Sequence, residues 1–198
     1  MKKIFYSMFL WTGILCAQKQ PFKKLSFSAN ISNPTELGDN FLNEGYSSNN
    51  GYDFAAQFYF VRHVFAGFQV KSTELKIENR NLIGDFSSGS STSKYFIVGY
   101  EHQIIPKTFL EYRLGFGSCN ISNYSPLSSY SLSGGSFLIG IKCDYHFIPQ
   151  ISVYAGLDYT TSKFNIELKG PYKDFYNKAA DITPTLGLRF SFWKNYNK

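Results

Sequence analysis

Charge is scarce in this 198-residue chain. Asp, Glu, Lys and Arg together make up 17% of the residues, and the formal net charge is +6. Two of the positive charges, Lys2 and Lys3, lie at the very start, and no Lys/Arg-rich run follows. Such a small and scattered charge argues against nucleic-acid binding. The aromatic content of 19% is too high for a disordered chain.

Long apolar runs are missing too, apart from a short one at the N-terminus. The first residues, MKKIFYSMFLWTGILCAQKQ, combine a basic start, an apolar stretch from Ile4 to Leu15 and the small Ala17. This pattern predicts a signal peptide at residues 1–17 and one exported domain at residues 18–198. A short N-terminal anchor is the alternative. The run is shorter than the roughly 20 residues that a membrane-spanning helix needs.

Cysteine is rare as well. After the predicted leader, the chain keeps only Cys119 and Cys143. Two thiols in an exported protein could form one disulfide. The strand pattern described next places these two residues on opposite faces and at different heights, so we predict that they do not pair.

What the chain does contain is an alternation of apolar and polar residues. It predicts eight strands, at about residues 24–33, 52–62, 64–78, 92–104, 108–121, 131–147, 151–166 and 181–193. Tight turns join strands two and three, four and five, and six and seven. The other connections are long and polar, at residues 34–51, 79–91, 122–130 and 168–180. Short turns and long loops therefore alternate strictly along the chain. This alternation predicts an antiparallel meander with all its long loops at one end.

The two faces of these strands differ in chemistry. In the segment FLIGIKCDYHF, Ile139 and Ile141 lie on an apolar face, whereas Lys142, Asp144 and His146 lie on the other. Alternation alone fits both a soluble lipocalin-type barrel, apolar inside, and a membrane barrel, apolar outside. We favour the membrane barrel, because the apolar face is too bulky to fill an eight-stranded interior. A charge that faces the bilayer midplane costs about 2–4 kcal/mol.

Aromatic residues are expected to form two girdles at the membrane interfaces. The girdle near the short turns is predicted to contain Tyr100, Tyr112, Tyr145, Phe147, Phe192 and Trp193, and the girdle near the long loops Tyr95, Tyr159 and Phe164.

These features resemble those of small outer-membrane β-barrels, the broad class that includes OmpX and the transmembrane domain of OmpA. The Asn-, Lys- and Tyr-rich sequence, with runs such as SFLIGIKCDYHF, is similar to the "outer membrane beta-barrel protein" families of Bacteroidetes-type bacteria. The resemblance implies an all-β fold, an eight-stranded antiparallel up-and-down transmembrane β-barrel with short periplasmic turns and longer extracellular loops. It also implies a location in the outer membrane of a Gram-negative bacterium.

The resemblance implies partners too: outer-membrane lipid and the barrel insertion machinery, for a protein that is otherwise a monomer. Barrels of this class usually end at a terminal aromatic residue, which the insertion machinery reads. Here KNYNK follows Phe192 and Trp193, and we expect this tail to be a periplasmic extension.

Charged residues on the polar face are the first candidate site. They are predicted to face the interior, where Glu101 should lie opposite Arg113. They could form an acid/base site or an ion path. We favour a paired polar filling, because buried charges of opposite sign must pair in so narrow a barrel. The predicted interior network is Lys71, Glu101, Glu111, Arg113, Lys142, Asp144, His146, Asp158 and Arg189.

Catalytic motifs are missing from the sequence. A lipid A deacylase-like site would need His, Ser and an acidic residue on the outer face near the long loops. The three histidines, His63, His102 and His146, all fall near the short turns. Metal-ligand spacing, a Gly-rich phosphate loop and a nucleophile elbow are absent. We therefore expect no enzyme activity, no metal and no cofactor.

The four long loops are the second candidate site. Aromatic side chains among Ser, Asn and Gly suit contact with an extracellular protein or glycan, or could pack the loops together. We predict a membrane-structural or surface-interaction role. The alternatives are a narrow ion or solute conduit, an outer-membrane lipid-modifying enzyme and a soluble periplasmic ligand-binding barrel. The candidate contact residues are Phe41, Tyr46, Phe86, Tyr124, Tyr130, Tyr172, Phe175 and Tyr176.

Overall fold

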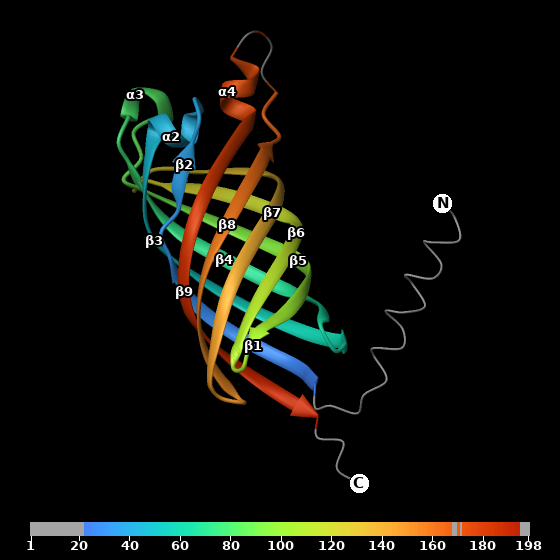
Figure 1. Ribbon diagram of the computed structural model, residues 1–198. Coiled ribbons are helices and arrows are strands. Elements are labelled where there is room, and N and C mark those ends of the chain that lie inside the picture. The colour runs from blue at the N-terminus through green and yellow to red at the C-terminus, as the bar shows by residue number, and fades with distance from the viewer. Residues whose placement is uncertain (1–21, 168–169, 171, 195–198) are drawn as a thin grey trace, which may run out of the picture.

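The computed structural model describes residues 22–167, 170 and 172–194, and it shows a closed β-barrel (Figure 1). The predicted signal peptide and the tail after residue 194 lie outside the described residues. The strands are β1 (Phe22–Ser32), β2 (Thr35–Leu37), β3 (Tyr46–Val61), β4 (Val64–Ile77), β5 (Ser88–Ile105), β6 (Thr108–Tyr124), β7 (Ser129–Ile148), β8 (Ile151–Phe164) and β9 (Lys178–Lys194). Short helices α2 (Phe41–Gly45), α3 (Arg80–Ile83) and α4 (Lys173–Asn177) lie between strands.

The ring itself has eight strands, all antiparallel. They pair in the order β1, β3, β4, β5, β6, β7, β8 and β9, and β1 also pairs with β9 to close the barrel. The small β2 pairs with β9 directly above β1. Pro34 separates β1 from β2, because proline cannot donate to the ladder. The predicted eight-stranded antiparallel barrel is confirmed. None of the described helices is long and apolar enough to cross a membrane.

The barrel closes with a fixed offset between its first and last strands. A row of paired residues can be followed once around the ring from Leu25 on β1, through Leu114 on β6, to Ile182 on β9. The partner of Ile182 is Thr35 on β2, so the row returns ten residues further along the chain than it started. A row of paired residues therefore climbs toward the long-loop end as it passes from β1 to β9. Strands in barrels of this kind are tilted by roughly 40°.

The tight turns and the long connections lie at opposite ends of the barrel (Figure 1). The strands extend further than predicted at the long-loop end: β3 begins at Tyr46, β5 at Ser88 and β7 at Ser129. Their upper parts carry Ser, Asn and Gly on both faces, so they lack the apolar alternation that reveals a strand. The predicted loop of residues 122–130 is consequently only a four-residue connection between β6 and β7.

The outer face of the barrel is an apolar belt. Large apolar side chains are exposed on every strand of the ring, and the polar residues between them point inward. This distribution excludes the soluble lipocalin-type alternative, which needs the opposite polarity. Belt members include Phe27, Phe54, Phe58, Phe68, Phe96, Leu114, Ile139, Ile141, Leu157, Leu186 and Leu188, each at least 39% exposed.

Three residues of the predicted girdles point inward instead. Tyr95 and Phe164 are only 2% and 1% exposed. Both occupy inward positions on β5 and β8, where Tyr95 bonds Ser136 and Phe164 packs against Phe41. Trp193 also points inward, toward Lys23 at the base. The alternation was misread at these positions because the interior contains aromatic side chains as well as polar ones.

The two cysteines are unpaired, as predicted. Cys119 is buried on the inner side of β6, and Cys143 is exposed on the outer side of β7. A disulfide would require their side chains to meet through the barrel wall.

We expect a charge in the middle of the belt to destabilise the barrel. Ile141→Arg on β7 should reduce the free energy of unfolding from lipid vesicles by about 2–4 kcal/mol, because the guanidinium faces hydrocarbon. Urea titration in vesicles measures this change. Ser131→Arg is the matched control, since it lies on the outer face of the same strand but above the belt. Equal effects of the two substitutions would contradict a lipid-facing belt.

Candidate functional sites in the interior and at the extracellular end

The base of the interior is built around Lys23 of β1. Its ammonium is 2.7 Å from Glu101 Oε2 and lies over the rings of Phe109, Trp193 and Tyr59, at 4.8, 5.6 and 5.7 Å from their centroids. A desolvated ammonium is stabilised by both the carboxylate and the aromatic faces. Sequence analysis missed this residue because it lies at the end of β1, beside an irregularity in the β1–β9 pairing.

The next layer is centred on Arg189 of β9, which gathers three carboxylates. Its Nη2 is 2.6 Å from Glu111 Oε2, and its Nη1 is 2.9 Å from Asp144 Oδ2 and 3.6 Å from Glu101 Oε2. Gln57 donates to both oxygens of Glu111 at 3.2 Å. Every group in this layer is at most 2% exposed. The guanidinium thus balances like charges that would otherwise repel one another.

A third layer pairs Arg113 with Asp158. The guanidinium donates to both carboxylate oxygens, through Nε at 3.2 Å and through a very short contact from Nη2. Its Nη1 donates to Gln69 Oε1 at 3.1 Å, and Gln69 donates in turn to Asp53. Such a bidentate arrangement is the strongest geometry for an Arg–carboxylate pair.

The predicted pairing of Glu101 with Arg113 is wrong. Glu101 lies opposite Glu111 in the β5–β6 ladder, and Arg113 lies opposite Gly99. The turn contains only Pro106 and Lys107, and the register shifts by one residue between Gln103 and Ile105. Turn length and this irregularity set the register, and they bring two carboxylates together.

The other predicted interior residues find different partners. Lys71 binds Asp181 Oδ1 at 3.1 Å and Thr183 Oγ1 at 2.6 Å, near the extracellular end. The Lys142 ammonium lies 4.2 Å from the centroid of the Tyr154 ring. His146 packs between Phe109 and Trp193 at the base. The structure therefore places all nine predicted residues inside the barrel, in several separate clusters.

Within the part of the chain that the structure describes, five cationic and five acidic side chains are buried in the interior. This balance explains how so narrow a barrel holds so many charges, since each lies within reach of opposite charges or polar groups. They are Lys23, Lys71, Arg113, Lys142 and Arg189, with Asp53, Glu101, Glu111, Asp144 and Asp158.

An apolar cluster closes the barrel above the charges. Helix α2, capped by the Asn40 side chain, places Phe41 and Leu42 over the opening. The Phe41 ring meets the Phe164 ring edge-on at a centroid distance of 5.4 Å and stacks on the Tyr176 ring at 6.2 Å. Below it, a small pocket at the mouth has a volume of about 30 Å³, room for only a few water molecules.

The predicted loop contact residues divide into two groups. Phe41 and Tyr46 were predicted to be exposed, but they are only 4% and 5% exposed and belong to the apolar cluster. Phe175 and Tyr176 pack against that cluster. Phe86 is half-buried. Apolar side chains in a long loop gain more from covering the mouth than from facing water. The exposed group consists of Tyr124, Tyr130 and Tyr172, at 50%, 51% and 72% exposure.

An unusual carboxyl lies at the mouth, above the belt. Glu36 of β2 is directly opposite Asp181 of β9. Burial, and then the negative charge of Asp181, raise the pKa of Glu36 to about 7. A hydrogen bond from Ser48 Oγ at 3.1 Å and the charge of Lys71 act in the opposite direction.

Comparison with solved structures shows what kind of fold this is. Neisserial surface protein A (NspA) matches with a TM-score of 0.63 and 10% identity, over 85% of this chain and 97% of that chain. Ail, the attachment invasion locus protein of Yersinia pestis, matches at 0.55 and 18%, over 86% and 99%. The N-terminal β-barrel domain of Pseudomonas aeruginosa OprF matches at 0.51 and 16%, over 87% and 100%. No protein-family model and no curated protein sequence matches the chain.

The fold is that of a small outer-membrane β-barrel. The apolar belt shows independently that lipid surrounds the ring, and closure leaves no unpaired strand edge in hydrocarbon. Fold and belt together identify an integral outer-membrane barrel of a bacterium, with outer-membrane lipid as its environment.

We expect Arg189 to be a major source of stability. Arg189→Met should reduce the free energy of unfolding by about 3–5 kcal/mol, because it leaves Glu101, Glu111 and Asp144 without their shared cation. Urea unfolding in vesicles measures this loss. The control is Lys178→Met, which breaks an exposed pair with Asp174 and should cost less than about 1 kcal/mol. A loss below 1 kcal/mol for both variants would contradict the layered pairing.

We also expect Glu36 to make stability depend on pH. An unfolded chain loses the Glu36 proton near pH 4.5, whereas the folded barrel keeps it to about pH 7. The contribution of Glu36 to stability is therefore complete below about pH 4.5, falls by at most about 3 kcal/mol between pH 4.5 and 7, and changes little above that. Urea midpoints across this range should decline less for Glu36→Gln. Glu74→Gln, an exposed glutamate on β4, is the control. Parallel curves for wild type and Glu36→Gln would contradict this assignment.

Proposed function

We propose that the protein is a non-catalytic surface-contact barrel, monomeric in the membrane, whose extracellular end binds a macromolecule outside the cell. The observation that supports this most is Leu127, which is 98% exposed at the tip of the β6–β7 hairpin. Tyr124 and Tyr130 flank it, each about half exposed. Tyrosine is enriched among the residues that contribute most to protein contacts, and burial of the exposed leucine between the two tyrosines would add hydrophobic free energy.

The tip is held in a defined shape. Ser125 N donates to Ser128 O at 2.8 Å, and Ser128 N donates back to Ser125 Oγ at 3.1 Å. Below the tip, Asn120 Oδ1 accepts hydrogen bonds from Ser131 and Ser133. A preorganised loop loses little conformational entropy when it binds, which favours a contact role. Sequence analysis found the two tyrosines but missed Leu127, which looked like a single apolar residue in a polar loop.

The interior supports the same proposal and gives little support to a conduit. Its charges pair with one another in layers, and the cluster over the mouth packs around Phe41 and Leu42. Filling of this kind stabilises a narrow barrel and occupies the space that an ion path would use. The histidines give no support to a lipid-modifying enzyme either: His63 and His102 lie beside Tyr100 near the short turns, and His146 points inward.

Ail offers a precedent for ligand binding by a barrel of this fold. A second structure of Ail, at a TM-score of 0.56 and 17% identity over 86% of this chain and 99% of that chain, is a complex with the heparin analogue sucrose octasulfate. For this chain we favour a protein partner, because an exposed leucine suits an apolar protein surface better than a sulfated sugar. Immobilised heparin then serves as the probe for the alternative partner, an anionic glycan.

Cells that display the barrel should adhere to a panel of immobilised extracellular proteins more strongly than cells without it. The triple variant Tyr124→Ser, Leu127→Ser and Tyr130→Ser should lower retention by about tenfold or more, since hot-spot side chains contribute at least about 1 kcal/mol each. Tyr172→Ser, which removes an even more exposed tyrosine on another loop, should change retention little.

Two results would contradict the proposal. One is equal retention of cells with and without the barrel on both the protein panel and heparin. The other is full retention of the triple variant. Retention on heparin alone would assign the contact to an anionic glycan instead of a protein.

A further inference from the structure

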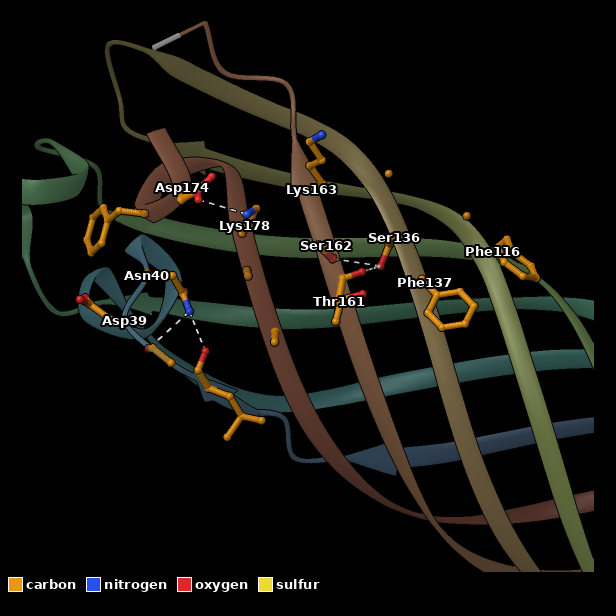
Figure 2. A pocket seen from close by; sticks show the side chains of 17 residues that line it. Asp39, Asn40, Phe116, Ser136, Phe137, Thr161, Ser162, Lys163, Asp174 and Lys178 are labelled. Atoms are coloured by element: carbon orange, nitrogen blue, oxygen red, sulfur yellow. Dashed lines mark hydrogen bonds and ion pairs between the residues drawn. The ribbon is translucent and has the colours of Figure 1, made fainter. Parts of the chain in front are cut away.

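A groove of about 840 Å³ lies on the outer wall of the barrel, at its long-loop end (Figure 2). Phe116, Phe137, Thr161 and Ala180 form its lower wall, one from each of the strands β6, β7, β8 and β9. The segment from Leu37 to Asn40 and helix α4 border it above. The groove adjoins the apolar cluster at the mouth through Phe175 and Ala179, and none of its lining residues belongs to the β6–β7 tip.

The groove follows from side-chain size along one row of paired residues. Phe116, Phe137, Thr161 and Ala180 are consecutive partners across the four strands. The row begins with two phenylalanines, whose rings lie 5.0 Å apart, and then drops to threonine and alanine. Small side chains next to large ones leave a hollow in the wall.

The groove also crosses the boundary of the membrane. Rows climb toward the extracellular end from β1 to β9, so Phe116 and Phe137 lie lower than Thr161 and Ala180. The phenylalanines therefore adjoin the upper edge of the apolar belt, and the rest of the groove lies at the level of lipid head groups. A ligand that fits both parts has an apolar end and a polar end.

The next row of the outer face, one step closer to the extracellular end, contains three lysines. Its members are Lys94, Ser118, Gly135, Lys163 and Lys178, again consecutive partners on β5 to β9. Asp174 binds Lys178 at 3.1 Å, but no acidic partner of Lys94 or Lys163 occurs among the described residues. Two short residues, Ser118 and Gly135, separate these two lysines, which lie roughly 14 Å apart by strand spacing.

We propose that this groove binds a phosphorylated lipid of the outer leaflet. The head-group phosphate lies over Ser118 and Gly135 between Lys94 and Lys163, and an acyl chain packs on Phe116 and Phe137. Lysine side chains on a membrane-facing surface extend toward the head groups, so both ammonium groups can reach this level. Unpaired cations above exposed aromatic rings complement an anionic amphiphile, whereas a soluble anion would leave the rings uncovered.

Native mass spectrometry of the detergent-solubilised protein tests this proposal, with diphosphoryl lipid A and phosphatidylethanolamine as probes. We expect lipid A to bind more tightly. Lys94→Gln and Lys163→Gln should each weaken lipid A binding roughly fivefold, as one cation near a charged lipid surface contributes about 1 kcal/mol. Lys173→Gln, at the same end on α4 but outside the groove, should leave binding unchanged.

A second variant blocks the groove without removing charge. A Cβ built at Gly135 meets no atom within 4 Å, so Gly135→Leu can be accommodated by the fold. It should weaken lipid A binding at least as strongly as either lysine variant. Heat-modifiable gel migration shows that each variant is folded.

Three outcomes would overturn the proposal. Lipid A and phosphatidylethanolamine could bind the folded wild type equally. Lys173→Gln could weaken lipid A binding as much as Lys163→Gln, which would indicate a diffuse charge effect. Gly135→Leu could bind lipid A like the wild type, which would show that the lipid does not occupy the groove.

Discussion

The closure of β1 on β9 is the constraint on which the rest of the molecule depends. Hydrocarbon cannot satisfy a free strand edge, so every strand at belt level must have two neighbours. Closure with an offset of ten residues between Leu25 and Thr35 tilts all strands together. The tilt decides which side chains share a height, and so which charges meet inside and which residues meet lipid outside. The interior layers and the outer groove therefore both depend on how neighbouring strands are aligned, and not on the sequence of any single strand.

The interior charges are a consequence of that geometry. The interior of an eight-stranded ring is just wide enough for its own side chains to fill, so the polar and charged residues on the inner face must pack against one another. The chain meets this with balanced charge: Glu101 and Glu111 lie directly opposite each other, and Arg189 from β9 joins them across the barrel. Two like charges in one ladder are tolerable only because a third strand supplies the cation. Those interactions therefore link strands that are not neighbours and reinforce closure.

Sequence reasoning worked where one physical rule acts alone. Alternation in FLIGIKCDYHF gave the correct faces for Ile141 and Lys142, because a lipid-facing position tolerates no charge. It failed where several influences combine. The pairing of Glu101 depends on the short Pro106–Lys107 turn and a nearby irregularity, and no pattern in either strand reveals these. Aromatic residues such as Tyr95 were also ambiguous, because a tyrosine suits a membrane interface and a polar interior equally well. Phe41 appeared exposed because the cluster that it joins is assembled from loops distant in sequence.

The extracellular end differs from the belt in one further way. Strands β3, β5, β6 and β7 continue beyond the belt as polar ladders rather than dissolving into loops. The strands pair through the same backbone hydrogen bonds here as in the belt. Water instead of lipid surrounds them, so serine and asparagine can occupy both faces. The ladder carries the Leu127 tip away from the membrane on a stiff support, and it places Lys163 and Lys178 at the level of the head groups. The same row geometry therefore supplies two different surfaces, one that projects into the medium and one that lies against the outer leaflet.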